Sequence, residues 1–287
     1  ADDKTAGAGT AENAAKSGVA AILAKDSDEA IAKAKQLLSV LPANNLETAG
    51  NDYYMENDAA VSADLKGIEL INSVADKESV IELYKQFGTS AVTAIGSLNW
   101  RTAGFVATNN GAKLTADDSA KIARFVTLCD AYSIPVVTFV DSEGFEKSSA
   151  AELAGSIRDS AKLAQAYASA TTAKIAVVTG KAYGSAYVAL ASTAAGSDFT
   201  FAWEGAVIAP TTPEAAVVFL NGVSEDNAKQ AQEYADNEAD AFTAAANGYV
   251  DRVITAEDTK SALTSAIEAT SSKRVVTPAK KHVNFVY

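Results

Sequence analysis

The most constraining feature of the sequence is residues 174–203, which read KIAVVTGKAYGSAYVALASTAAGSDFTFAW. The apolar, β-branched run at 175–178 predicts a buried strand. A tight turn at 183–186 comes next, and the small residues at 187–193 predict a helix that starts at once. A second apolar run ends at Trp203. A strand, turn and helix with small side chains at the turn leave backbone N–H groups free at the helix N-terminus.

These free amides, together with the positive end of the helix dipole, can stabilise a developing oxyanion. Other catalytic groups are scarce, because His282 and Cys129 are the only histidine and cysteine. The sequence therefore predicts neither a Ser-His-Asp nor a Cys-His device, and no metal site. No phosphate-binding glycine motif occurs either. If the chain is an enzyme, backbone amides, the substrate or a cofactor must supply the catalytic groups.

Composition limits the function classes. The 287 residues are 48% hydrophobic and carry a formal net charge of −12. This length is sufficient for one large domain or two small ones. The negative charge argues against nucleic-acid binding, and no apolar run approaches the ~20 residues that span a bilayer. Residues 1–4 do not begin a signal peptide, and the lone Cys129 excludes an internal disulfide, which together predict a cytoplasmic location.

Periodicity predicts alternating strands and helices over most of the chain. Strands are expected at 18–24, 79–85, 91–98, 102–108, 134–140, 206–209 and 250–254. Helices are expected at 26–40, 117–133, 151–171, 213–220 and 259–270, with one or two more within 225–248. Residues 65–74 remain ambiguous. The alternation predicts an α/β architecture built from ββα-type units.

Seven segments, taken in order, carry a resemblance to a known family. They are SGVAAILAKDSDEAIAKAKQLLSVLPANNLE (17–47), RTAGFVATN (101–109), DDSAKIARFVTLCDAYSIPVVTFVDSEGF (117–145), AKIAVVTGKAYGSAYVALAS (173–192), FAWEGAVIA (201–209), NGYVDRVI (247–254) and KRVVTPAKKHVNFVY (273–287). Together they resemble the carboxyltransferase subunit of biotin-dependent acyl-CoA carboxylases and decarboxylases, of the propionyl-CoA carboxylase β and methylmalonyl-CoA decarboxylase α type. The resemblance extends over nearly all of residues 17–287.

The resemblance implies a crotonase (ClpP-like) fold, with ββα superhelical units and C-terminal helices. The family has two such domains in tandem, and this chain looks like the second. The expected division is a flexible N-terminus at 1–16, the end of the preceding domain or a connecting segment at 17–64, and a crotonase-like C-terminal domain at 65–287.

The resemblance also implies a catalytic site at the turn. The family's backbone oxyanion hole falls on Gly184, Ser185 and Ala186, with the amides of the last two as donors. Family members commonly have a second glycine where this chain has Ser185. The hole would stabilise an oxygen of biotin or of the thioester while the carboxyl group moves.

Four further residues are implied in cofactor binding. Gly144 and Phe145, which come directly after a predicted strand, would line the biotin pocket, with loop packing as the alternative. Tyr183 lies beside the turn, where packing is again the alternative. Val188 occupies the position at which many carboxylases place an aspartate near the acyl group.

The implied function is transfer of a carboxyl group between biotin on a carrier protein and an acyl-CoA. The implied partners are an N-terminal carboxyltransferase domain or subunit, the biotin-carboxyl-carrier protein and the acyl-CoA, in a homo- or hetero-oligomer. A membrane would be involved only indirectly, through a decarboxylase complex. Two alternatives stay open: a stand-alone acyl-CoA hydratase or isomerase that uses Glu143 or Glu204, and a non-catalytic scaffold that docks the carrier protein.

Overall fold

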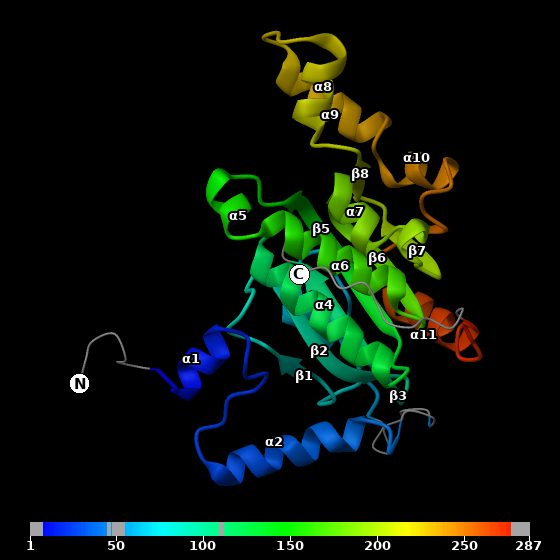
Figure 1. The fold of residues 1–287 in the computed structure, drawn as a ribbon. Coiled ribbons are helices and arrows are strands. Elements are labelled where there is room, and N and C mark those ends of the chain that lie inside the picture. The colour runs from blue at the N-terminus through cyan, green and yellow to red at the C-terminus, as the bar shows by residue number, and fades with distance from the viewer. Residues whose placement is uncertain (1–7, 45–46, 48–54, 109–111, 277–287) are drawn as a thin grey trace.

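One mixed sheet organises the chain, in a computed structural model that describes residues 8–44, 47, 55–108 and 112–276. Strands follow the order β1-β2-β3-β5-β6-β7-β9, while β4 is added to β5 and β8 to β6 (Figure 1). Pairing is antiparallel from β1 to β3 and parallel from β3 onward. The strands are β1 (Ile81–Leu83), β2 (Ala91–Leu98), β3 (Arg101–Thr108), β4 (Ala112–Leu114), β5 (Val136–Phe145), β6 (Lys174–Tyr183), β7 (Phe199–Trp203), β8 (Val207–Ala209) and β9 (Arg252–Ile254).

Helices cover both faces of this sheet. On one face α4 and α6 pack against each other, and on the other face lie α3 and α11. Figure 1 shows α8 and α9 projecting together beyond one end of the sheet. The helices are α1 (Ala11–Lys16), α2 (Ser27–Val40), α3 (Gly67–Val74), α4 (Ala116–Ala131), α5 (Ser149–Leu153), α6 (Ser156–Ser169), α7 (Gly184–Leu190), α8 (Pro213–Asn221), α9 (Asn227–Asn237), α10 (Ala241–Ala246) and α11 (Thr259–Ala269). In the described part of the chain, none of them has the length and hydrophobicity that a membrane crossing requires.

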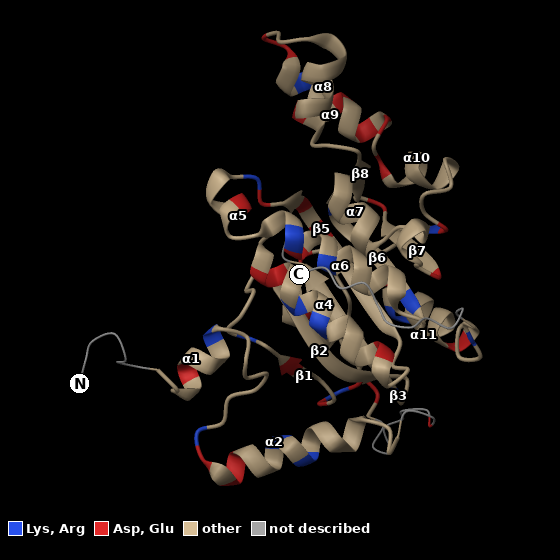
Figure 2. Ribbon diagram, viewed as in Figure 1, with Lys and Arg blue, Asp and Glu red and all other residues tan. Residues whose placement is uncertain are grey.

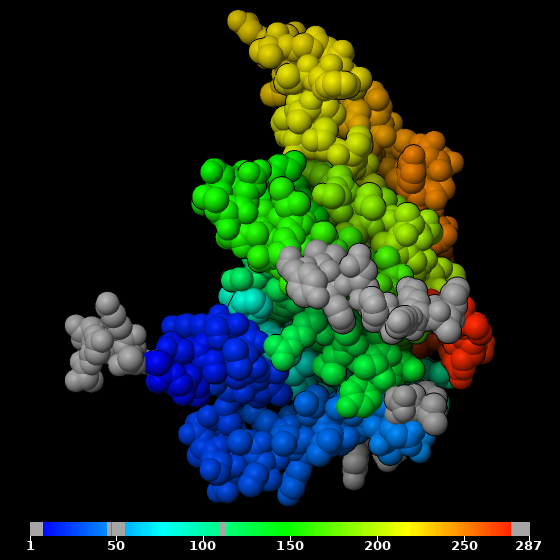
Figure 3. Space-filling view, viewed as in Figure 1, coloured from blue at the N-terminus to red at the C-terminus, as the bar shows by residue number. Residues whose placement is uncertain are grey.

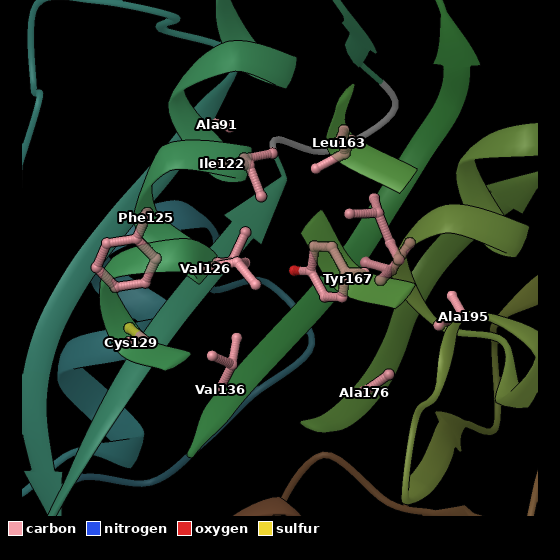
Figure 4. Close-up of a cluster of buried hydrophobic side chains, with 14 of the residues drawn as sticks. Ala91, Ile122, Phe125, Val126, Cys129, Val136, Leu163, Tyr167, Ala176 and Ala195 are labelled. Atoms are coloured by element: carbon pink, nitrogen blue, oxygen red, sulfur yellow. The ribbon is translucent and has the colours of Figure 1, made fainter. Parts of the chain in front are cut away.

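Strand β6 illustrates why its sequence is a continuous apolar run. Ala176 and Val178 belong to the core beneath α4 and α6, whereas Ile175 and Val177 belong to the core beneath α3 and α11. Successive side chains of a strand point to opposite faces, so a strand covered on both faces is apolar throughout. Figure 4 shows the first core, where the Tyr167 hydroxyl lies 2.8 Å from Thr138 Oγ1.

Local signals predicted most elements correctly. The strand at 91–98 is β2, with the expected bounds, and the helix at 26–40 is α2. Asp26 is its N-cap, since the carboxylate accepts a hydrogen bond of 2.8 Å from the Glu29 amide. The ambiguous 65–74 segment contains helix α3, and helix α1 lies within the 1–16 segment, for which no element was expected.

Two of the predicted segments do not form the expected element. Residues 18–24 form no strand: the segment has no ladder with β1, and its backbone bond there is the one from the Tyr84 amide, just after β1, to the Ala21 carbonyl. The single helix at 151–171 is two helices, α5 and α6, separated at Gly155. Gly155 has a φ of +94°, a left-handed conformation that glycine adopts without strain.

A buried lysine ties α4 to the loop before β2. Lys121 is 1% exposed, and its ammonium donates to the carbonyls of Ala91 at 2.7 Å and Gly88 at 3.3 Å. Burial lowers the pKa of Lys121 to about 8, and Asp118 and Glu82 oppose this shift only in part. The ammonium is therefore less favoured in the folded chain than in the unfolded chain.

We expect Lys121 to make the free energy of unfolding of the chain depend on pH. Between pH 8 and 10.5 the unfolded chain holds the proton that the folded chain has lost, so the free energy of unfolding rises with pH. Relative to Lys121→Met, which does not titrate, the wild type should gain on the order of 2 kcal/mol from pH 7 to pH 10. Denaturant melts of both proteins measure this gain, and a difference that is constant with pH would contradict the assignment.

Candidate active site

The turn predicted from the sequence is a sharp junction between β6 and α7. The strand ends at Tyr183 and the helix begins at the next residue, Gly184. The prediction that the helix starts at Tyr187 is therefore wrong by three residues. Gly184, Ser185 and Ala186 form the first helical turn instead of a separate loop. We call residues 183–186 the elbow.

The elbow leaves backbone donors without helical acceptors. The first amides of an α-helix have no intrahelical partner. Tyr183, the N-cap residue, has extended backbone angles, with φ of −108° and ψ of 133°, and its side chain makes no capping hydrogen bond. Ser185 is exposed and Ala186 is buried beneath it. α7 itself carries no charged side chain, as Figure 2 shows, so the positive end of its dipole is not offset by a charge on the helix.

Gly184 is required by the shape of the elbow. Its φ is +56°, in the left-handed region. A Cβ atom at this position would lie 3.0 Å from the carbonyl oxygen of Pro210, which comes directly after β8. Because β8 pairs with the last three residues of β6, this backbone approach is fixed by the sheet. Only glycine combines this conformation with so little space.

The structure brings Gly144 to the elbow. β5 continues to Phe145, five residues beyond the predicted end at Val140, because the unpredicted strand β4 pairs with its last part. Gly144 has a φ of +110°, and a Cβ there would lie 3.8 Å from the Tyr183 carbonyl oxygen. Phe145 is half-buried and packs on the core beneath α4 and α6.

Tyr183 in the elbow and Tyr187 just after it both make contacts that hold the fold together. Tyr183 is 6% exposed and clusters with Ala209 and Ala239, and burial raises the pKa of its hydroxyl. The Tyr187 hydroxyl donates to the Tyr249 carbonyl at 2.6 Å, which ties α7 to the segment after α10. Val188, in contrast, is 51% exposed and stands one helical turn beyond Ser185.

Lys181 and Asp141 lie beside the elbow and had not been identified from the sequence as part of the site. Lys181 Nζ lies 2.8 Å from Glu143 Oε1, and this bond raises the pKa of Lys181. The Lys181 amide donates to Asp141 Oδ1 at 2.9 Å. The hydratase alternative needs a poised carboxylate, but Glu143 is held in this ion pair, and Glu204 is exposed beyond the end of β7. The position of Asp141 directly after an apolar strand run was the available sequence signal.

The elbow opens to the surface of the chain. Ser185 and Val188 are exposed, and Figure 3 shows the projecting α8–α9 pair at the same end of the molecule. A cavity of about 340 Å³ lies at the opposite end of the central strands, where β3, β5 and β6 begin, beside Arg101, Thr172 and Lys273. The Lys273 ammonium there is neutralised by Asp198 at 2.8 Å. The elbow and this cavity are thus separate features.

Comparison with known proteins accords with this arrangement. The Carboxyl transferase domain family matches residues 2–285. The methylmalonyl-CoA carboxyltransferase 12S subunit of Propionibacterium freudenreichii subsp. shermanii is 35% identical over 300 residues, covering 96% of this chain and 57% of that protein. The methylmalonyl-CoA decarboxylase subunit alpha of Veillonella parvula is 34% identical over 287 residues, covering 93% of this chain and 56% of that protein.

Structural comparison gives the same answer. The transcarboxylase 12S crystal structure, a hexamer assembly with methylmalonyl-coenzyme A and methylmalonic acid bound, aligns with a TM-score of 0.88 at 35% identity. The alignment covers 96% of this chain and 58% of that chain, so the chain spans little more than half the length of these relatives. The crotonase-like fold expected from the sequence is confirmed. The chain belongs to the carboxyl transferase domain family.

Proposed function

We propose that this chain is the C-terminal half of a carboxyltransferase that moves a carboxyl group between biotin on a carrier protein and the α-carbon of an acyl-CoA. The observation that carries the proposal is the elbow at Ser185 and Ala186, where the N-cap residue Tyr183 makes no capping bond, in a chain that belongs to the carboxyl transferase domain family. Backbone amides suit this reaction because negative charge develops on oxygen while the carboxyl group moves.

The elbow suits the ureido group of biotin. Two neighbouring amides match a carbonyl oxygen as acceptor, and Ser185, the first of the two residues, is exposed at the surface. Bound biotin would supply the nitrogen that accepts or releases the carboxyl group. The amides of Ser185 and Ala186 would then hold the adjacent oxygen and lower the energy of its negative charge, by about 3 to 4 kcal/mol for each donor.

The remaining residues of the elbow would orient the ligand. Gly144 would lie against the ring beside Tyr183, and Phe145 and Tyr183, which pack into two separate clusters, would support it from the protein side. Val188 would contact the acyl group from its exposed position on α7. No side-chain nucleophile is needed in this scheme, which agrees with the scarcity of histidine and cysteine.

A second domain would complete the site. Ser185 of the elbow is exposed, and α8, which projects beyond this end of the sheet, exposes Phe219 at 89% and Leu220 at 61%. Exposed apolar surface of this kind commonly marks a protein interface. We propose that an N-terminal carboxyltransferase domain or subunit, which brings the CoA, covers this end, and that the assembly is oligomeric. We further propose a cytoplasmic location, in which the buried Cys129 stays reduced.

Reconstitution tests the proposed function. The chain is mixed with a separately produced N-terminal half of a family member and free biotin, and decarboxylation of malonyl-CoA and methylmalonyl-CoA is monitored by CO₂ release. We expect biotin-dependent turnover only when both halves are present. Turnover by the isolated chain without biotin, or no turnover in any reconstituted pair, would contradict the proposal.

Val188 should set part of the acyl preference. Replacing this exposed apolar side chain by aspartate removes a contact for the methyl branch of methylmalonyl-CoA. We expect Val188→Asp to lower the ratio of kcat/KM for methylmalonyl-CoA to that for malonyl-CoA by about tenfold, because one methyl contact discriminates by this order. Val188→Ile, which keeps an apolar surface, is the matched control. An unchanged ratio in Val188→Asp would remove Val188 from the acyl site.

A further inference from the structure

The last part of β6 deviates from the regular sheet just before the elbow. Val140 of β5 pairs with Val178 of β6, but the next pair is Ser142 with Ala182. β5 therefore advances by two residues where β6 advances by four. Within this bulge, Asp141 is the single β5 residue opposite residues 179–181 of β6. A bulge of this kind bends a strand and changes the direction of the chain beyond it.

The same bulge changes the partner strand of β6. Before it, residues 175–178 pair with β7, and after it, residues 181–183 pair with β8. The pairing with β8 brings the Pro210 carbonyl against Gly184. The direction of the elbow amides thus depends on how the bulge is held.

The carboxylate of Asp141 holds the bulge. Asp141 is 7% exposed, and its Oδ1 atom accepts a hydrogen bond of 2.9 Å from the Lys181 amide. This bond replaces the ladder bond lost in the bulge. The Asp141 amide is itself anchored by Thr108 Oγ1 at 2.7 Å. A Cβ on Gly180 would lie 2.5 Å from Asp141 Oδ1, so the strand passes directly over the carboxylate.

We propose that Asp141 is a positioning residue that aims the elbow amides at their ligand oxygen through Lys181 and the end of β6. This inference rests on the proposed function for its effect on the reaction, but its structural part stands independently. The Asp141 carboxylate accepts the amide of Lys181, in the strand segment that leads directly into Gly184. Its loss should therefore change the direction of the elbow amides and not only the stability of the chain.

Three variants separate positioning from general stability. Asp141→Ala removes the acceptor for the Lys181 amide, whereas Asp141→Asn keeps one oxygen acceptor of the same reach. Asp130→Ala is the matched control, because Asp130 Oδ1 accepts the amides of Thr171 and Thr172 at 2.7 and 2.9 Å, at the other end of β6.

The first readout is hydrogen–deuterium exchange of the isolated chain, which needs no activity. We expect Asp141→Ala to speed exchange at least tenfold in the peptide covering 179–190, with little change in β2 and β3, and Asp141→Asn to restore much of the protection. Asp130→Ala should leave the 179–190 peptide as in the wild type. Unchanged exchange at 179–190, or an equal increase throughout the sheet in Asp141→Ala, would overturn the inference.

The second readout is the reconstituted enzyme. We expect Asp141→Ala to lower kcat roughly 10- to 100-fold with KM for the acyl-CoA within threefold of the wild type, since small misplacement of catalytic groups has effects of this size. Asp141→Asn should recover most of kcat, and Asp130→Ala should retain it. A wild type without turnover would refute the proposed function and leave the exchange result to decide this inference. An active wild type with an equally active Asp141→Ala would overturn the inference alone.

Discussion

Replacing Ser185 by proline should lower kcat of the reconstituted enzyme by about 100- to 1,000-fold while the chain stays folded. Proline removes the N–H of Ser185 and leaves the other elbow amide in place, and loss of one oxyanion donor has an effect of this order. Proline is tolerated in the first turn of a helix, where the amide has no helical acceptor. The measurement is kcat for decarboxylation beside a thermal melt.

The control for this variant is Ser185→Ala. It removes the hydroxyl and keeps the N–H, so we expect kcat within threefold of the wild type. If both variants lost activity equally, the hydroxyl or the local packing would be responsible rather than the amide. If neither lost activity, the elbow would not be the oxyanion hole.

Replacing Gly184 by alanine should damage both stability and activity. At a φ of +56° a non-glycine residue costs roughly 1 to 2 kcal/mol, and the new Cβ would press on the Pro210 carbonyl at 3.0 Å. To relieve this contact β8 and the elbow must separate, which turns the amides away from their target. We expect a lower melting temperature and a loss of kcat of at least tenfold.

Gly205→Ala is the matched control for this effect. Gly205 is exposed, and a Cβ there meets nothing within 4 Å. We expect this variant to melt and turn over as the wild type does. A Gly184→Ala protein with the wild-type melting temperature would show that the elbow is not held against the Pro210 carbonyl.

Much of the fold was predictable because its signals are local. Every residue of the run at 175–178 is apolar, and successive side chains of a strand point to opposite faces, so the run indicates a strand covered on both faces. Asp26 predicts the start of α2 because a carboxylate at the N-cap binds an amide of the first turn. The elbow was located from the same kind of signal, small residues directly after a strand.

The remaining details depend on contacts between distant segments. β5 extends to Phe145 only because β4 pairs with it, and β4 is three residues long. α7 starts at Gly184 rather than Tyr187, and Gly184 lies against the Pro210 carbonyl, a contact with a later segment that the local sequence does not show. The sequence places Asp141 directly after an apolar run, but only the bulge between β5 and β6 shows that its carboxylate binds the Lys181 amide.

A crystal structure of the reconstituted pair with free biotin tests the central claim most directly. The quantity to measure is the distance from the ureido oxygen of biotin to the backbone nitrogens of Ser185 and Ala186. We predict that both distances fall between about 2.7 and 3.2 Å, the range of N–H to oxygen hydrogen bonds. Biotin bound with this oxygen on side chains or water, and with both amides turned to protein acceptors, would contradict the account.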